Sequence, residues 1–129
     1  RQKFGDWYGM DGVPWCAIFV TWCYAGTGTV SFKKGSRYAY VPYIVADARA
    51  GRYGLQVVRE PSPGDVVCYD WDGGVADHTG LFRQWENRER GVFLAVEGNT
   101  AVGNDSNGGE VMIRERHFSQ VECFVRAGR

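Results

Sequence analysis

Cys16 stands at the start of a strongly apolar segment and is the first candidate for chemistry in this sequence. Pro14 suits the first turn of a helix, and Gly26 suits the left-handed position after the last turn, so a helix is predicted over 14–25. Nearly every residue between them is apolar, which predicts a helix buried in the core without a solvent face. The unpaired N–H groups and the dipole at the helix start favour a thiolate over a thiol at Cys16. Cys16 is therefore a candidate nucleophile.

Two histidines could serve as its base, and their positions differ. His78 follows a glycine-containing loop at 70–77 and begins a predicted strand at 78–85. A side chain at the junction of loop and strand can be both rigid and accessible, which suits a general base. His117 follows the charged segment Arg114–Arg116 and is predicted to be an ordinary surface histidine.

A third polar group stands at the end of the apolar strand predicted over 92–97. Glu97 and Asn99 are two residues apart, so in an extended chain they point to the same face. If this strand pairs with the His78 strand, either side chain could accept the imidazole N–H and fix the orientation of the ring. The alternative is that the pair only satisfies backbone groups of a turn. A thiolate, an imidazole and an orienting acceptor together are the components of a cysteine hydrolase.

The remaining pattern indicates how these groups are positioned. A second helix is predicted over 42–50, with Ile44, Val45 and Ala48 facing inward and Asp47 facing solvent. The helices come first and the strands follow, which predicts an α+β fold with helices packed on a five- to six-stranded, mostly antiparallel sheet. The predicted strands are 55–58, 66–69, 78–85, 92–97, 110–116 and 121–125.

Bulk composition limits the classes of function. The chain has 129 residues, of which 44% are hydrophobic, enough for one domain with a substantial core. Fifteen basic residues balance fifteen acidic ones, so neither a nucleic-acid-binding patch nor attraction to a membrane surface is expected. No apolar run approaches the roughly 20 residues that span a bilayer, and no signal peptide is recognised. The sequence does not begin with Met, and we expect residues 1–129 to be a single catalytic domain cut from a longer protein.

The four cysteines are predicted to be reduced. Cys16 and Cys23 are seven residues apart in one helix, about 10 Å along its axis, which is too far for a disulfide. Cys68 and Cys123 lie in apolar strand segments and are predicted to be small buried side chains. No cysteine or histidine pair has the spacing of a zinc site, and we expect neither a metal nor another cofactor.

Four blocks of this sequence, taken in order, resemble a known family. They are PWCAIFVTW at 14–22, PGDVV at 63–67, DHTGL at 77–81 and EGNT at 97–100. They resemble the signature blocks of CHAP domains, the cysteine- and histidine-dependent amidohydrolase/peptidase domains of phage endolysins and bacterial cell-wall hydrolases. The resemblance implies a papain-like fold, Cys16 as nucleophile, His78 as general base and acid, and Glu97 with Asn99 as orienting groups. It also implies peptidoglycan as substrate, cleaved at N-acetylmuramoyl-L-alanine or within the stem peptide or cross-bridge.

One feature of some CHAP endolysins is missing. Those proteins carry a calcium loop of alternating Asp residues before the cysteine and a further Asp two residues after it. Here Ile18 occupies the second place, and Asp6 and Asp11 are five residues apart, so no calcium site is predicted.

Large aromatic side chains are expected to line the substrate groove, while Trp22 and Trp85 are expected to pack in the core. The groove candidates are Trp7, Tyr8, Trp15, Trp71 and Asp77. We expect a monomer that acts at the bacterial cell wall, released by phage lysis, carried on a virion, or secreted through a part of the protein outside this chain. Two other functions remain open, a wall-binding module without catalysis and an amidase for a small soluble amide.

Overall fold

The structure is a computed structural model that describes residues 16–25, 38, 40–71, 73–74, 76, 78–98 and 111–128. The described residues form two α-helices, two short 3-10 helices and a six-stranded sheet. The helices are α2 (Cys16–Ala25), α3 (Val41–Arg49), η1 (Arg52–Gly54) and η2 (Phe118–Gln120). The strands are β1 (Leu55–Val58), β2 (Val66–Tyr69), β3 (His78–Asn87), β4 (Val92–Gly98), β5 (Val111–His117) and β6 (Val121–Ala127).

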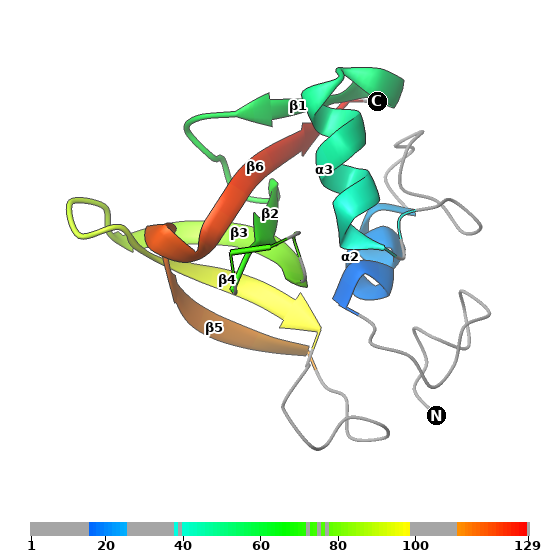
Figure 1. The fold of residues 1–129 in the computed structure, drawn as a ribbon. Coiled ribbons are helices and arrows are strands. Elements are labelled where there is room, and N and C mark those ends of the chain that lie inside the picture. The colour runs from blue at the N-terminus through cyan, green and yellow to red at the C-terminus, as the bar shows by residue number, and fades with distance from the viewer. Residues whose placement is uncertain are drawn as a thin grey trace.

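The sheet has the strand order β1-β6-β2-β3-β4-β5, and every pair is antiparallel. Strands β3 and β4 form a hairpin, which is the pairing on which the predicted contact between His78 and Glu97 depends, and β5 adds to its outer edge. The last strand, β6, lies between β1 and β2, an insertion that the order of elements along the chain does not reveal. Figure 1 shows α2 and α3 together on one side of the strands, which confirms the predicted α+β class.

Apolar side chains fill both faces of the sheet, because successive residues of a strand point to opposite sides. One cluster joins α2 and α3 to the sheet and includes Phe19, Ile44 and Val66. The other covers the opposite face and is mainly aromatic, with Tyr69 and Phe93 at its centre. Strands β2, β3, β4 and β6 therefore have apolar packing on both faces.

Helix α2 is less buried than its composition predicted. Phe19 and Val20 are buried against the sheet, but Trp22 is 39% exposed and Cys23 and Tyr24 are half-buried. The prediction of a helix without a solvent face, with Trp22 in the core, is therefore wrong. Helix α2 packs on β3 and β4 from one side of the sheet only, so its other side is not enclosed by these strands.

Helix α3 begins with Pro42 in its first turn and buries Ile44, Val45 and Ala48, as predicted. Asp47, expected to face solvent, is instead fully buried. Its carboxylate accepts a hydrogen bond from the Tyr38 hydroxyl at 2.6 Å and pairs with Arg52 at 3.3 Å. These partners replace the water that the charge would otherwise require, which explains how an acidic residue lies on the inner face of a helix.

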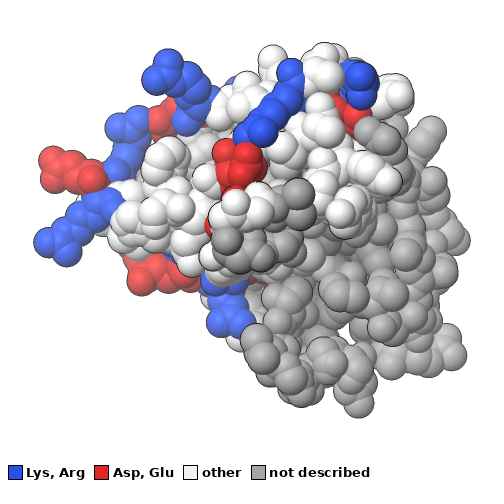
Figure 2. Space-filling view, in the orientation of Figure 1, with Lys and Arg blue, Asp and Glu red and all other residues white. Residues whose placement is uncertain are grey.

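The four cysteines are free, which confirms the prediction that they are reduced. Cys68 and Cys123 face each other across β2 and β6, and both are buried. Charged side chains are distributed without a dominant sign. Over the described part of the face seen in Figure 2, Arg side chains are interspersed with Asp and Glu, and Arg49 pairs with Glu122.

Candidate active site

Cys16 is the first residue of α2 and is only 5% exposed. The helix carries it to the sheet because Phe19 and Val20, one turn further on, are buried in the cluster between helix and strands. Cys16 therefore lies at the start of a helix, as predicted, and its role as nucleophile stays a prediction.

His78 is the first residue of β3 and pairs with Tyr69 of β2. Its ring packs against two aromatic side chains, stacked on Tyr69 with centroids 5.5 Å apart and tilted against Trp71 at 5.3 Å, and these two rings also contact each other at 5.3 Å. The residue is 4% exposed. Two rings and a regular strand therefore hold the imidazole in a single orientation.

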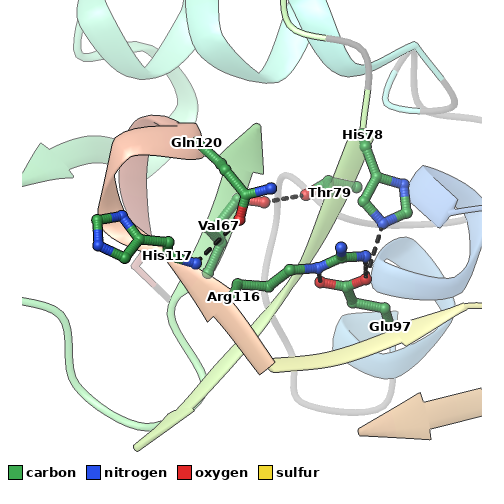
Figure 3. A network of polar contacts seen from close by, with 7 residues as sticks. All are labelled: Val67, His78, Thr79, Glu97, Arg116, His117 and Gln120. Atoms are coloured by element: carbon green, nitrogen blue, oxygen red, sulfur yellow. Dashed lines mark hydrogen bonds and ion pairs between the residues drawn. The ribbon is translucent and has the colours of Figure 1, made fainter. Parts of the chain in front are cut away.

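Glu97 is the acceptor that the structure places against this histidine. Strands β3 and β4 pair with Leu81 opposite Val96, so Glu97 lies across from the start of β3. The distance between Nε2 of His78 and Oε1 of Glu97 is 2.9 Å, and both side chains are buried (Figure 3). Of the two candidates that the sequence left open, Glu97 makes this contact; Asn99 lies outside the described residues.

The contact with Glu97 occupies Nε2 of His78, and the ring also interacts with the Cys16 side chain. Burial by itself lowers the pKa of His78, but hydrogen bonds and negative charge from Cys16 and Glu97 outweigh it and raise the pKa to about 9. An imidazolium is thus stable at neutral pH between the two side chains. This geometry can hold a thiolate–imidazolium pair, the reactive form of a cysteine nucleophile.

Arg116 of β5 completes the site, although the sequence analysis treated it only as part of a charged strand. Its Nε donates to Oε2 of Glu97 at 2.9 Å and its Nη2 donates to Oε1 at 2.5 Å. Burial raises the pKa of Glu97, but the hydrogen bonds from Arg116 and His78 lower it to about 2. The available signal was the alternation in β5, which puts Arg114 and Arg116 on one face of an otherwise ordinary strand.

Gly80 is a second residue whose role the sequence analysis missed. It lies two residues after His78 on β3, on the same face of the sheet as Glu97. A Cβ atom at Gly80 would lie 2.5 Å from Cγ of Glu97. The Glu97 side chain therefore occupies the space that a side chain at position 80 would need.

The groove predictions are only partly covered by the described residues. Trp71 is 41% exposed and contacts His78, and its role in a substrate groove stays a prediction. The other four candidates, Trp7, Tyr8, Trp15 and Asp77, lie outside the described residues. His117 is exposed and its ring accepts a hydrogen bond from the backbone N–H of Ser119, which confirms that it is a surface residue.

The described part of the chain also bears on metal binding and on membrane-spanning helices. Within residues 16–25, 40–71, 78–98 and 111–128, His, Cys, Asp and Glu form no group of three that could hold a metal ion. Asp6 and Asp11 are not among these residues. Neither of the described helices is long and apolar enough to cross a bilayer.

Comparison with known proteins places this fold and site in a family. Residues 7–99 match the family model of the CHAP domain, and this protein belongs to that family. CHAP domains are typically amidohydrolases and peptidases, and the family is one of peptidoglycan hydrolases. The observed α+β arrangement is the class that the papain-like family fold implied.

Among solved structures, the chain is similar to the wild-type endolysin LysIME-EF1, with 22% sequence identity and a TM-score of 0.44. The similarity covers 57% of this chain and 37% of that chain, so this protein spans well under half the length of that endolysin. A search of curated proteins gave no match.

Proposed function

We propose that this protein hydrolyses an amide bond of peptidoglycan, with Cys16 as nucleophile, His78 as general base and acid, and Glu97 as the group that orients His78. The observation that carries the proposal is the position of His78, whose Nε2 lies 2.9 Å from Oε1 of Glu97 while the ring also interacts with the Cys16 side chain. A nucleophile, a base and an orienting acceptor are the three groups that a cysteine amidohydrolase requires, and the family to which the chain belongs favours the same chemistry.

The reaction follows from the placement of these groups. The Cys16 thiolate attacks the carbonyl carbon of the scissile amide and forms a tetrahedral intermediate. The His78 imidazolium then gives its proton to the amide nitrogen, the C–N bond breaks, and the acyl group remains on sulfur as a thioester. A water molecule gives a proton to neutral His78 and attacks the thioester, which releases the carboxylic acid and restores the thiolate–imidazolium pair.

Negative charge on the tetrahedral oxygen needs donors in fixed positions. Backbone N–H groups at the start of α2, including that of Cys16, are the proposed donors, because the first four N–H groups of a helix have no partner within it. Glu97 stabilises the positive charge that His78 carries before it gives up its proton. Asn99 is proposed as a second orienting group, two residues further along the same chain segment.

The biological setting belongs to the same proposal. The expected bond is the N-acetylmuramoyl-L-alanine amide or an amide of the stem peptide or cross-bridge. We propose a single CHAP catalytic domain, monomeric, that acts on the bacterial cell wall as part of a phage endolysin. Trp71, together with Trp7, Tyr8, Trp15 and Asp77, is proposed to line the substrate groove.

The proposal is tested by incubating the protein with purified cell walls from several bacteria and following turbidity, free amino groups and the mass spectrum of the products. We expect new amino groups and fragments that identify one type of amide bond. Cys16→Ser should lose essentially all of this activity. Cys23→Ser is the matched control, because Cys23 lies in the same helix but burial raises its pKa to about 11, which disfavours a thiolate.

Each other result has a definite meaning. Full activity in folded Cys16→Ser or in His78→Ala would contradict the mechanism, whereas His117→Ala should remain active because His117 lies on the surface. Binding to walls without release of amino groups would favour a wall-binding module. Hydrolysis of small soluble amides, with no release from walls, would favour an amidase of a different substrate class.

A further inference from the structure

Arg116 reaches the catalytic glutamate from the edge strand of the sheet. In the register of β4 and β5, Arg116 lies opposite Phe93, whereas Glu97 lies opposite Met112. The arginine side chain therefore extends along the sheet, past the position of Ala95, to meet the carboxylate (Figure 3). Fixing an extended arginine side chain in one conformation costs conformational entropy. Other contacts of the Arg116 side chain must therefore offset this cost.

Two aromatic rings hold the guanidinium group. Its central carbon lies 4.5 Å from the ring centroid of Trp71 and 5.4 Å from that of Tyr69. The same two rings contact the imidazole of His78. Tyr69 is fully buried and the Arg116 side chain is only 15% exposed. Arg116 and His78, the two partners of Glu97, therefore pack against the same pair of aromatic rings.

The contact between Arg116 and Glu97 uses two nitrogen atoms and both carboxylate oxygens. Nε and Nη2 donate in parallel, which fixes the plane of the carboxylate as well as its position. Oε1 accepts from Arg116 and also lies 2.9 Å from Nε2 of His78. Lysine has a single point charge and could not reproduce this forked contact.

The charge of Glu97 depends on this pairing, because the carboxylate is only 2% exposed. In the described part of the chain, the charged or titratable groups that face Glu97 and His78 are Cys16 from α2, Tyr69 from β2 and Arg116 from β5. Arg116 is the permanent cation in this set. Its removal would leave a buried carboxylate with one imidazole as its partner, and burial would then favour the neutral acid.

We propose that Arg116 is a positioning residue, which fixes the Glu97 carboxylate against Nε2 of His78 and keeps it ionised. The inference rests on the proposed cysteine mechanism, in which Glu97 orients His78. Arg116 does not contact the reacting atoms; it acts through Glu97.

The test compares Arg116→Met, Arg116→Lys and the control Arg114→Met. Arg114 lies two residues away on the same strand and pairs with Ala95, so its removal changes the net charge equally. For Arg116→Met we expect kcat/KM on cell walls to fall by about 100-fold, the order that misplacement of a reacting group by 1 Å can cost. The acidic limb of the pH profile should move to higher pH. Arg116→Lys should retain part of the activity, and Arg114→Met should stay within about twofold of the wild type.

A measurement that does not need catalysis separates this inference from the proposed function. The ¹³C resonance of the Glu97 carboxyl should not titrate above about pH 3 in the wild type, because its pKa is about 2. It should titrate at clearly higher pH in Arg116→Met and, if that variant does not fold, in Arg116→Lys. An unchanged titration, or unchanged kcat/KM and pH profile in folded Arg116→Met, would overturn the inference. If walls are not hydrolysed at all, the proposed function fails, and the NMR titration still decides the role of Arg116.

Discussion

Gly80 and Glu97 face each other across β3 and β4, and the glutamate side chain lies where a side chain at position 80 would be. An added Cβ would come within 2.5 Å of Cγ of Glu97 and 3.0 Å of the backbone oxygen of Val96. Glycine is usually unfavourable in the interior of a strand, and the close approach of the Glu97 side chain to the backbone of β3 explains why a glycine occurs at position 80. The absence of a side chain at Gly80 lets Glu97 lie flat against the strand that carries His78.

Gly80→Ala should therefore displace Glu97 from His78. We expect overpacking to destabilise the fold by about 1–3 kcal/mol and the activity on cell walls to fall by at least tenfold, because Glu97 must move. Urea unfolding and kcat/KM would measure the two effects. Gly51→Ala is the control, since Gly51 has a positive φ of 68° but open space around its Cα. Strain there should reduce stability without a loss of activity, and equal activity in both variants would contradict the proposed contact.

Glu97→Gln keeps the shape of the side chain and removes its charge. Glutamine can still accept from Nε2 of His78, but Arg116 then lacks a counter-charge and the imidazolium is less stabilised. The pKa of His78, raised to about 9 in the wild type, should fall. Activity should fall by about 100-fold, yet by less than in His78→Ala, since thiol and imidazole remain. NMR titration of His78 and wall hydrolysis check the two parts, and an unchanged pKa would show that Glu97 does not stabilise the imidazolium.

The stability of the protein should depend on pH through His78 and Glu97. The pKa of His78 rises from 6.5 to about 9 on folding, so its contribution is complete below about pH 6.5 and is lost as the pH rises through about 9. The pKa of Glu97 falls from 4.5 to about 2, so its contribution is complete above about pH 4.5 and is lost as the pH falls through about 2. Both contributions are therefore complete between about pH 4.5 and pH 6.5.

Unfolding in urea at pH 5.5 and pH 9.5, for the wild type and His78→Gln, measures this effect. The difference in unfolding free energy between the two proteins should be larger at pH 5.5, by on the order of 2–3 kcal/mol. A difference that does not change with pH would mean that His78 is not stabilised as an imidazolium in the folded protein.

Asp65, in the Pro-Gly-Asp turn before β2, is predicted to have a structural role. It is buried and accepts from the backbone N–H of Ser62 at 2.7 Å and from two nitrogens of Arg126 at 3.1 and 2.7 Å. These contacts tie the turn to β6. Asp65→Asn replaces one carboxylate oxygen by an NH₂ group, which would face the N–H donors of Ser62 or Arg126. Tm should therefore fall by about 5 °C or more, while catalysis should persist at lower temperature.

The exposed pair of Glu60 and Arg88 is the control for Asp65. Both of its side chains are more than half exposed, so Glu60→Gln should change Tm far less. Equal shifts in Asp65→Asn and Glu60→Gln would show that burial of the Asp65 contacts does not matter. A loss of wall hydrolysis in folded Asp65→Asn would indicate a direct role in the reaction.

The local chemistry of the sequence was sufficient to propose Cys16, His78 and Glu97 as site residues and to predict the elements that carry them. A helix start, a strand start and a strand end each leave a signal within a few residues, in proline and glycine positions and in apolar periodicity. The antiparallel α+β class followed from the order of those elements. The pairing of β3 with β4 followed as well, since neighbouring strands with a short turn usually form a hairpin.

Tertiary structure decided the contacts between distant segments. Arg116 meets Glu97, Asp47 meets Tyr38, and β6 enters between β1 and β2. The alternation in β5 indicates the face on which Arg116 lies, but no local pattern indicates the partner in any of these contacts. Exposure of Trp22 was also decided at this level, because it depends on which side of α2 the sheet covers. The physical reason is that register and packing, set by the whole chain, determine which charges are buried together, whereas the sequence alone determines which residues are able to react.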